Sequence, residues 1–332
     1  MHSLAIDQGG TKTMAIVFDD EGHILGKGVG AGACHFFDGM PKAMAAVEAA
    51  AKLALAQARL ATKDLRAISA GLAGANWPEE IVALETELRT LLSVKDVKVY
   101  NDCLIALRGG TARIRWAVLC AGTGLNAAVR FNEGAPFVYN NYIEDLDQGA
   151  KGLGARALRA IFLSEIGVLP PTILTEIALR FFEFEKVDQF LLAYQRQQLR
   201  KPIQDLSPLL FEAAGQSDRV ALEIISQFGV SISRYPIAAI QKHGAQNAEM
   251  DIVLSGGLFK AKDTLLIKTI TDEIHRIAPN ARIIEAAYEP VVGAMLLVLD
   301  SKYRGEIPPA VMRNCQTSAE KLNLVRIKSA EI

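Results

Sequence analysis

The chain opens with a stretch whose residue types suit a phosphate group and a metal ion, Asp7-Gln8-Gly9-Gly10-Thr11-Lys12-Thr13. Short apolar runs flank it and predict two strands joined by a tight glycine turn. Glycines let backbone N–H groups approach a phosphate, threonine hydroxyls can donate to it, and Asp7 can hold a metal ion. The alternative is an ordinary turn with a polar tip, because glycine and threonine are common in turns. If the stretch is a phosphate hairpin, its binding residues are Gly9, Gly10, Thr11, Lys12 and Thr13.

Three later stretches carry related chemistry. Gly122-Thr123-Gly124 repeats the glycine turn between two apolar runs, and Ser255-Gly256-Gly257 lies between an apolar run and a helical pattern. Two such turns facing each other can clamp the phosphates of one nucleotide, and the glycine pair leaves room for an adenine ring. Asn101-Asp102 ends a predicted strand, where Asp102 can accept a proton from an attacking hydroxyl or bind magnesium.

The elements that must position these residues follow a repeated pattern. The first part predicts strands at 3–7, 12–18, 24–29, 67–70 and 97–100, with helices at 43–60 and 79–92. The second part predicts strands at 117–120, 127–131, 251–254 and 282–284, a helical region at 150–242, a helix up to 278 and a last helix at 290–299. Strand–helix–strand alternation makes parallel pairing through crossovers.

The repetition indicates an α/β protein with two similar lobes that meet at a cleft. We expect a first lobe at residues 1–114 and a second lobe at 115–300 that contains a helical insertion. Residues 301–332 are more polar and are expected to form a tail with one short helix, packed back on the first lobe.

Composition and charge exclude several kinds of partner. The chain has 332 residues, half of them hydrophobic, and a formal net charge of −1. The charge balance therefore favours neither nucleic acid nor an acidic membrane surface as a partner. The four cysteines lack the spacing of a zinc or iron–sulfur site, and no apolar run approaches the roughly 20 residues of a membrane span. We expect a cytoplasmic protein, without a membrane association, that binds a small molecule or another protein.

Several other reactive side chains receive structural interpretations. The five histidines, His35 among them, lack the spacing of a triad or a ligand set and are interpreted as surface or core residues. Cys103 is interpreted as a buried apolar cysteine, with a thiol activated at a helix start as the alternative. Asn76-Trp77-Pro78 is interpreted as the entry of a helix with Pro78 in its first turn, with a role in lining the cleft as the secondary alternative. Lys151, close to Asp147, is a candidate either for a phosphate contact or for a solvated loop.

In their order along the chain, these motifs resemble the actin-like sugar-kinase ATPase superfamily. Within it they resemble the BadF/BadG/BcrA/BcrD-type ATPases and the N-acetylglucosamine kinase-like branch, over residues 3–300. Further matches are Gly71-Leu72-Ala73-Gly74-Ala75 and Glu289-Pro290-Val291-Val292-Gly293-Ala294. The resemblance implies two ribonuclease-H-like lobes around a nucleotide cleft, ATP and Mg²⁺ as cofactors, and Asp102 as the base that deprotonates a sugar hydroxyl. It leaves a homodimer open.

The resemblance also assigns site residues. The metal would be held by Asp7. The implied ATP contacts are Gly9, Gly10, Thr11, Lys12, Thr13, Gly122, Thr123, Gly124, Gly256 and Gly257. The implied sugar contacts are Asn101, Asp102, Thr123 and Asp147.

Three positions depart from the family pattern. Gln8 stands where the family usually has glycine, and is expected to crowd the terminal phosphate. Leu125 stands where the family usually has a serine after Gly-Thr-Gly, which removes a hydroxyl near phosphate. Gln148 replaces the glutamate of a Gly-Asp-Glu-Gly-Ser motif in which Asp147 and Gly149 are kept, and the glycine-rich loop before that motif is absent.

The resemblance predicts an ATP-dependent kinase that phosphorylates a hydroxyl of a small sugar, N-acetylglucosamine or glucosamine. Two alternatives stay open: an ATPase that activates a partner enzyme, and a catalytically silent sugar or nucleotide sensor with the same fold. The scattered cysteines argue against the first, because activators of that kind carry bridging cysteines for a cluster. The departures at Gln8, Leu125 and Gln148 keep the second open.

Overall fold

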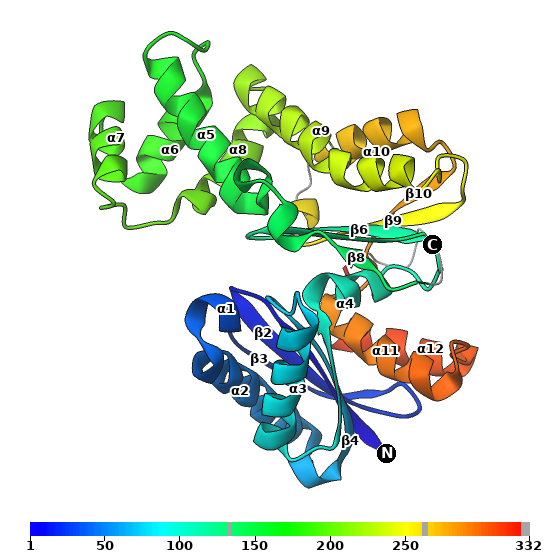
Figure 1. Cartoon of the computed structure of the whole chain (residues 1–332). Coiled ribbons are helices and arrows are strands. Elements are labelled where there is room, and N and C mark those ends of the chain that lie inside the picture. The colour runs from blue at the N-terminus through cyan, green and yellow to red at the C-terminus, as the bar shows by residue number, and fades with distance from the viewer. Residues whose placement is uncertain (132–133, 261–264, 327–332) are drawn as a thin grey trace. The chain divides into compact units, whose positions relative to one another are not determined.

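The computed structural model describes residues 1–131, 134–260 and 265–326, which pack as two compact units (Figure 1). Unit 1 consists of Met1–Ile114 and the described part of Ile284–Ile332, and unit 2 consists of Arg115–Ile283. Over the described residues, the strands form two five-stranded sheets. Within the same ranges, none of the helices is long and apolar enough to cross a membrane.

The sheet of unit 1 has the strand order β3-β2-β1-β4-β5. The β1–β2 and β2–β3 pairs are antiparallel, and the β1–β4 and β4–β5 pairs are parallel. The strands are β1 (His2–Gln8), β2 (Lys12–Asp19), β3 (Ile24–Ala31), β4 (Leu65–Leu72) and β5 (Asp96–Asn101). The helices are α1 (His35–Asp38), α2 (Met40–Ala58), the 3₁₀ turn η1 (Thr62–Asp64), α3 (Pro78–Leu92), α4 (Asp102–Arg108), α11 (Pro290–Tyr303) and α12 (Pro309–Lys321).

Helices cover both faces of this sheet (Figure 1). On one face, α2 and α3 bury an apolar cluster that includes Leu4 and Ile6 of β1. On the other face, α4, α11 and α12 bury a cluster that includes Ala5. Successive residues of β1 therefore point alternately into two cores. Helix α2 lies close against β3 because Gly28 has no side chain, and a Cβ there would collide with the Ala50 carbonyl.

The sheet of unit 2 has the order β10-β9-β6-β7-β8. The β6–β7 and β7–β8 pairs are antiparallel, and the β6–β9 pair is parallel. The strands are β6 (Trp116–Ala121), β7 (Leu125–Arg130), β8 (Phe137–Val138), β9 (Met250–Ser255) and β10 (Ala281–Glu285). The helices are α5 (Gly149–Glu165), α6 (Ile173–Phe182), α7 (Val187–Gln195), α8 (Leu206–Gly215), α9 (Arg219–Lys242) and α10 (Leu265–Ile277), with 3₁₀ turns η2 (Asn140–Tyr142), η3 (Asp145–Asp147), η4 (Ile203–Asp205) and η5 (Gly257–Lys260).

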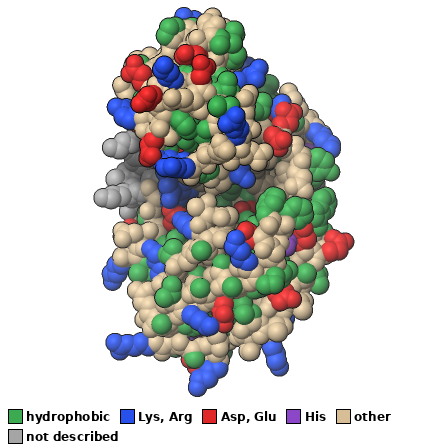
Figure 2. Space-filling view, turned by 90° about the vertical axis from the view of Figure 1, so that its left-hand side faces the viewer, with side chains coloured by type: hydrophobic (Ala, Val, Ile, Leu, Met, Phe, Trp, Pro, Cys, Tyr) green, Lys and Arg blue, Asp and Glu red, His purple; other side chains and the backbone are tan. Residues whose placement is uncertain are grey.

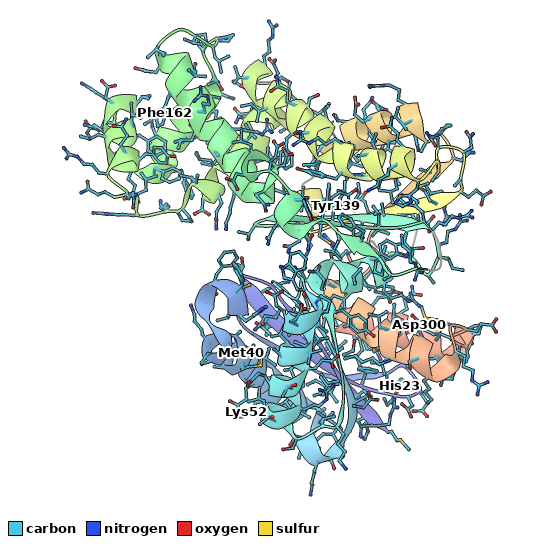
Figure 3. All side chains as sticks on the ribbon, in the orientation of Figure 1. His23, Met40, Lys52, Tyr139, Phe162 and Asp300 are labelled. Atoms are coloured by element: carbon cyan, nitrogen blue, oxygen red, sulfur yellow. The ribbon has the colours of Figure 1, made fainter. Side chains whose placement is uncertain are left out.

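The helices α5 to α8 extend the apolar core of unit 2 beyond its sheet. Phe162 of α5 lies among them (Figure 3), with its ring centroid 5.9 Å from that of Phe190 in α7. Residues of these helices and of β6, β7 and β9 belong to one continuous buried cluster. The helical insertion expected between residues 150 and 242 is therefore part of the same core as the sheet.

The α/β architecture with two similar sheets is confirmed. The division of the chain differs from the expected one at residues 284–300, because α11 packs in unit 1 and not with the second sheet. Helix α11 buries several apolar residues, and Gly293 lets it approach α4 where a Cβ would collide with the Ile105 carbonyl. Helix α12 lies against β3, where the Ser318 hydroxyl accepts a hydrogen bond from the Ile24 N–H at 3.1 Å. The short strand β8 was not expected.

Candidate active site

The first glycine turn joins β1 to β2, and a hydrogen bond from the Gly9 N–H to the Lys12 carbonyl closes it at 2.9 Å. Gly10 is exposed at the tip, and the described structure leaves open space where its Cβ would be. Thr11 and Lys12 are exposed beside it. Behind the turn lies Gly32, where a Cβ would collide with the Thr11 backbone. The turn is thus held in place on one side and offers an open backbone edge on the other, as phosphate binding requires.

Gln8 and Thr13 face each other across this hairpin and point into the core beneath α2. Gln8 is 1% exposed, and its Nε2 donates to the Ala43 carbonyl at 2.8 Å. Thr13 is fully buried, and its hydroxyl donates to the Ala31 carbonyl at 2.8 Å. Gln8 therefore leaves the tip of the turn clear, so the expected crowding is wrong. The expected phosphate contact at Thr13 is also wrong, because strand alternation turns its hydroxyl inward.

Asp7 lies on the opposite face of β1, together with the residues that begin α4 and α11. Burial raises its pKa from 3.8 to about 7, and the negative charges of Asp102 and Glu289 add to the effect. The positive charges of Lys12 and Arg326 act in the opposite direction. Lys12 Nζ lies 3.5 Å from Glu289 Oε2. The first turn is therefore accompanied by three carboxylates and two cations, all from unit 1.

These residues fit a divalent cation that is bound together with phosphate. A cation at Asp7 would lower the pKa of this carboxyl, because its charge would offset the effect of burial and the repulsion from Asp102 and Glu289. Within the described residues, no group of three or more His, Cys, Asp or Glu side chains is placed to hold a metal ion by itself. Mg²⁺ usually takes one or two carboxylates and fills its remaining positions with water and phosphate oxygens. Asp7 is the residue that would hold it here.

Asp102 is the first residue of α4 and directly follows β5. Asn101 caps this helix, and its Oδ1 accepts a hydrogen bond from the Cys103 N–H at 3.1 Å. The Asn101 Nδ2 donates to the Asn76 side chain at 2.8 Å. Asn101 is 2% exposed, so the expected sugar contact there is corrected: this residue positions Asp102. Asp102 itself is partly exposed, as a group that exchanges a proton with a ligand must be.

Two segments of unit 1 carry residues that the sequence interpretation treated mainly as structural. After β4, the Asn76 N–H donates to Glu80 Oε2 at 3.0 Å. After β3, His35 Nε2 lies 3.9 Å from Glu80 Oε1. Aromatic surfaces with a few fixed polar groups are typical of small-ligand sites. Three aromatic side chains in these segments are 51 to 82% exposed, namely Trp77 just before α3, and Phe36 and Phe37 in α1. In the sequence, the feature that could have identified them is an aromatic residue shortly after each of two glycine-containing strands.

The second glycine turn joins β6 to β7, and the start of α5 packs on it. The Gly122 N–H donates to the Gly124 carbonyl at 2.9 Å, and the Ala150 N–H donates to the Gly122 carbonyl at 2.9 Å. Gly149 has φ of +47°, and a Cβ there would collide with the carbonyls of the turn. The carbonyls of Gly122 and Thr123 thus accept hydrogen bonds from the first turn of α5. Around Gly122 the described structure leaves open space, next to the partly exposed Thr123.

Two of the departures from the family pattern support this second turn. Leu125 is 5% exposed and packs in the core of unit 2, so it does not replace a hydroxyl that faces a ligand. Gln148 Oε1 accepts a hydrogen bond from the Leu125 N–H at 3.2 Å, and its Nε2 donates to the Ile143 carbonyl at 3.3 Å. Both departures therefore act on the position of the turn and leave its tip unobstructed.

The two glycines after β9 have different surroundings. Gly256 has φ of +109°, and a Cβ there would collide with the backbone of Ala121 at the end of β6. At Gly257 the described structure leaves open space around the Cβ position. Gly256 is thus needed by the backbone of unit 2 itself. Gly257 is the position at which a planar base has room.

Asp147 is 1% exposed and bound on both carboxylate oxygens. Its Oδ1 accepts from Arg156 at 3.1 Å, and its Oδ2 accepts from Arg234 at 2.7 Å and from the Tyr235 hydroxyl at 3.0 Å. Tyr139 continues this network (Figure 3), because its hydroxyl donates to the Tyr235 carbonyl at 2.7 Å. The expected sugar contact at Asp147 is therefore corrected: the residue anchors the loop before α5.

Two sheets of matching strand order, each with a glycine turn between its central antiparallel strands, define an actin-like ATPase fold. More specifically, the chain belongs to the BadF/BadG/BcrA/BcrD ATPase family, whose family model matches residues 4–298.

Two kinases and one solved structure resemble the chain along most of its length. An N-acetyl-D-glucosamine kinase of Dictyostelium discoideum is 25% identical over 315 residues, which cover 90% of this chain and 98% of that protein. Glucosamine kinase GspK of Vibrio cholerae is 26% identical over 245 residues, which cover 72% of this chain and 80% of that protein. A solved glucokinase of the ROK family from Streptomyces griseus has a TM-score of 0.61 at 18% identity, covering 90% of this chain and 99% of that one.

Proposed function

We propose that the chain is an ATP-dependent kinase that phosphorylates a hydroxyl of a small sugar, with N-acetylglucosamine or glucosamine as the acceptor. The observation that carries the proposal is the carboxylate of Asp102, positioned by Asn101 and close enough to Asp7 to raise its pKa. A kinase needs a carboxylate beside its phosphate and metal site, because the acceptor loses a proton where the phosphoryl group arrives. The names of the two kinase relatives support the choice of acceptor.

Each unit has its own part in this proposal. In unit 1, Asp102 orients the acceptor hydroxyl and takes its proton, while Lys12 and the open backbone at Gly10 orient the terminal phosphates. Asp7 would hold Mg²⁺, which would supply positive charge near the phosphoryl oxygens. In unit 2, the turn at Thr123 binds phosphate and the space at Gly257 takes the adenine ring of ATP.

The segments after β3 and β4, which include α1 and the residues before α3, form the acceptor side of unit 1. Their exposed aromatic side chains offer apolar surface for one face of a sugar ring. Asn76 joins these segments to Asn101 by the side-chain hydrogen bond of 2.8 Å, so the acceptor surface and the base belong to one connected set of residues. This connection is the reason why we assign the acceptor to unit 1.

The proposal is tested by measuring ADP release from the purified protein with N-acetylglucosamine, glucosamine, glucose, N-acetylmannosamine and no sugar. We expect release to depend on an amino sugar. Steady release without any sugar would indicate an ATPase, and ATP binding without turnover would indicate a sensor.

The family match favours one second candidate, an ATPase that activates a partner protein. Activators that share a metal cluster need exposed cysteines at the contact with the partner. Here Cys34, Cys103 and Cys315 are buried, and Cys120 is partly exposed. We therefore rank this candidate second. The homodimer stays a prediction.

A further inference from the structure

The turn after β4 places Asn76 beside the residues that begin α4. Leu72 and Asn101, the last residues of β4 and β5, lie opposite each other in the parallel register. Asn76 follows shortly after Leu72, and its Oδ1 accepts a hydrogen bond from the Asn101 Nδ2 at 2.8 Å. Asp102 directly follows Asn101. Asn76 therefore lies with Asp102 at the carboxyl edge of the sheet, which is where open α/β sheets bind their ligands.

The backbone and the side chain of Asn76 are both held in place. Its N–H donates to Glu80 Oε2 at 3.0 Å, while its side chain is tied to Asn101. Gly74, two residues earlier, has φ of +86°, and a Cβ there would come within 2.9 Å of the His35 Cε1 atom. The turn that carries Asn76 is thus closely packed before a ligand arrives, so less conformational freedom is lost on binding.

The two ends of the Asn76 amide have different surroundings. The carbonyl end is occupied by the hydrogen bond from Asn101. In the part of the chain that the structure describes, no group accepts a hydrogen bond from the Asn76 Nδ2, and this nitrogen is not among the buried polar atoms that lack a partner. The Nδ2 is therefore an accessible donor in a fixed orientation. An amide nitrogen donates hydrogen bonds and accepts none, so its partner must be an acceptor atom.

We propose that Asn76 is a further acceptor-binding residue, whose Nδ2 donates a hydrogen bond to an oxygen of the sugar close to the hydroxyl that Asp102 deprotonates. Because its Oδ1 is bound to Asn101, Asn76 ties the position of the sugar to the position of the base. A ligand without an oxygen at this place would leave the donor unpaired and would bind more weakly. The inference rests on the proposed function, since it requires a sugar in unit 1.

A purely structural role would leave Asn76 as a support of Asn101 without any contact to the sugar. Two substitutions separate the two roles. Asn76→Asp keeps an oxygen that accepts from Asn101 but replaces the accessible donor by a second oxygen. Asn76→Ala removes the support and the donor together. Loss of support alone would lower the turnover number of Asn76→Ala, through the position of Asp102, and leave the affinity for the sugar unchanged in both variants.

The test is calorimetric titration of the wild type and the variants with N-acetylglucosamine and with glucosamine, in the presence of Mg²⁺ and a non-hydrolysable ATP analogue. The control variant is Asn314→Ala, because the Asn314 Nδ2 donates to the Glu21 carbonyl at 2.9 Å elsewhere in unit 1. We expect both Asn76 variants to bind the preferred sugar about 5- to 50-fold more weakly, the usual effect of losing one hydrogen bond to a ligand. Asn314→Ala should match the wild type.

Monodeoxy analogues of the preferred sugar identify the oxygen that Asn76 contacts. The wild type should bind one analogue more weakly than the parent sugar, because that analogue lacks the accepting oxygen. Asn76→Ala has already lost the donor, so it should bind this analogue and the parent sugar equally well. The same relative loss for every analogue in the wild type and in Asn76→Ala would overturn the inference.

Wild-type affinity of Asn76→Asp for the sugar would also overturn the inference, whatever the result for Asn76→Ala. Thermal unfolding of each variant checks that the fold is intact, and Asn76→Asp keeps the hydrogen bond that supports Asn101. If the wild type binds a sugar through Asn76 but transfers no phosphate to it, the proposed function fails while the inference stands. If the wild type phosphorylates a sugar that both variants bind normally, the inference alone fails. If the wild type binds no sugar, both fail.

Discussion

The two units share a sheet topology but surround their glycine turns differently. In unit 1, β2 and β3 lie on one side of the central strand β1, and β4 and β5 lie on the other. In unit 2, β7 and β8 lie on one side of the central strand β6, and β9 and β10 lie on the other. The turn of unit 1 is accompanied by charged side chains, among them Asp7 and Lys12. The turn of unit 2 is held by the start of α5 and by Gln148. The same topology thus supports one site rich in charge and one shaped mainly by backbone and open space.

The difference begins at equivalent positions of the two hairpins. Asp7 is the last residue but one of β1, and Cys120 is the last residue but one of β6. Figure 2 shows Lys, Arg, Asp and Glu side chains interspersed on the face of the molecule in view. In our proposal, proton transfer, metal binding and contacts to the terminal phosphates belong to unit 1, and unit 2 contributes the backbone turn at Thr123 and the space at Gly257. Substitutions in one unit should leave the function of the other largely intact.

The largest effect is expected for Asp102→Asn in unit 1. The amide keeps the size and hydrogen bonding of the side chain but cannot take a proton. Sugar-dependent turnover should fall by roughly 10²- to 10⁴-fold, the usual cost of losing a general base. Nucleotide affinity, measured by titration, should change little. Asp96→Asn, at the exposed start of β5, is the matched control, and near wild-type turnover of Asp102→Asn would remove Asp102 as the base.

The next effect is a pH dependence of stability that comes from Asp7. Its pKa is raised from 3.8 to about 7 in the folded protein, so between these values the folded state keeps a proton that the unfolded state has lost. The free energy of unfolding should therefore decrease as pH rises from 4 to 7, by up to about 4 kcal/mol, and then level off. Urea unfolding of wild type and Asp7→Asn across this range measures the difference. The same slope in both proteins would contradict the assignment, and Mg²⁺ with nucleotide should reduce the slope in the wild type.

A smaller effect is expected at the glycine pair of unit 2. Gly257→Val fills open space, so it should weaken ATP binding about tenfold or more without lowering the melting temperature. Gly256→Val forces a side chain into the Ala121 backbone at positive φ and should destabilise unit 2 itself. Calorimetric titration and thermal unfolding of the two variants separate these outcomes. Unchanged ATP affinity in Gly257→Val would remove this turn from the nucleotide site.

The smallest effect on activity is expected for Gln8→Gly. Because the Gln8 side chain donates to Ala43 inside the core, its loss should cost about 1–3 kcal/mol of stability and leave the kinetic constants nearly unchanged. Steady-state kinetics and chemical denaturation of this variant measure the two quantities. A large loss of turnover with an intact fold would mean that Gln8 contacts a ligand.

The sequence predicts the strands, the turns and the repetition of the fold because each depends on local periodicity and on glycine. The packing of α11 could not be predicted in this way, because an apolar helix can pack on either sheet. Gly293 allows α11 to approach α4 closely, and this fit is visible only in the folded structure. The same applies to side-chain direction at the site. Asn101 and Asp147 look like ligand contacts by type, but each is buried with a partner that is distant in sequence, Asn76 for Asn101 and Arg234 for Asp147.

The central claim is that unit 1 transfers a phosphoryl group to a sugar hydroxyl. The most direct test follows the labelled terminal phosphate of ATP in the presence of purified protein, Mg²⁺ and N-acetylglucosamine or glucosamine. The proposed function predicts that the label appears in a sugar phosphate in the same amount as ADP. Label recovered only in inorganic phosphate, at a rate independent of the sugar, would contradict it.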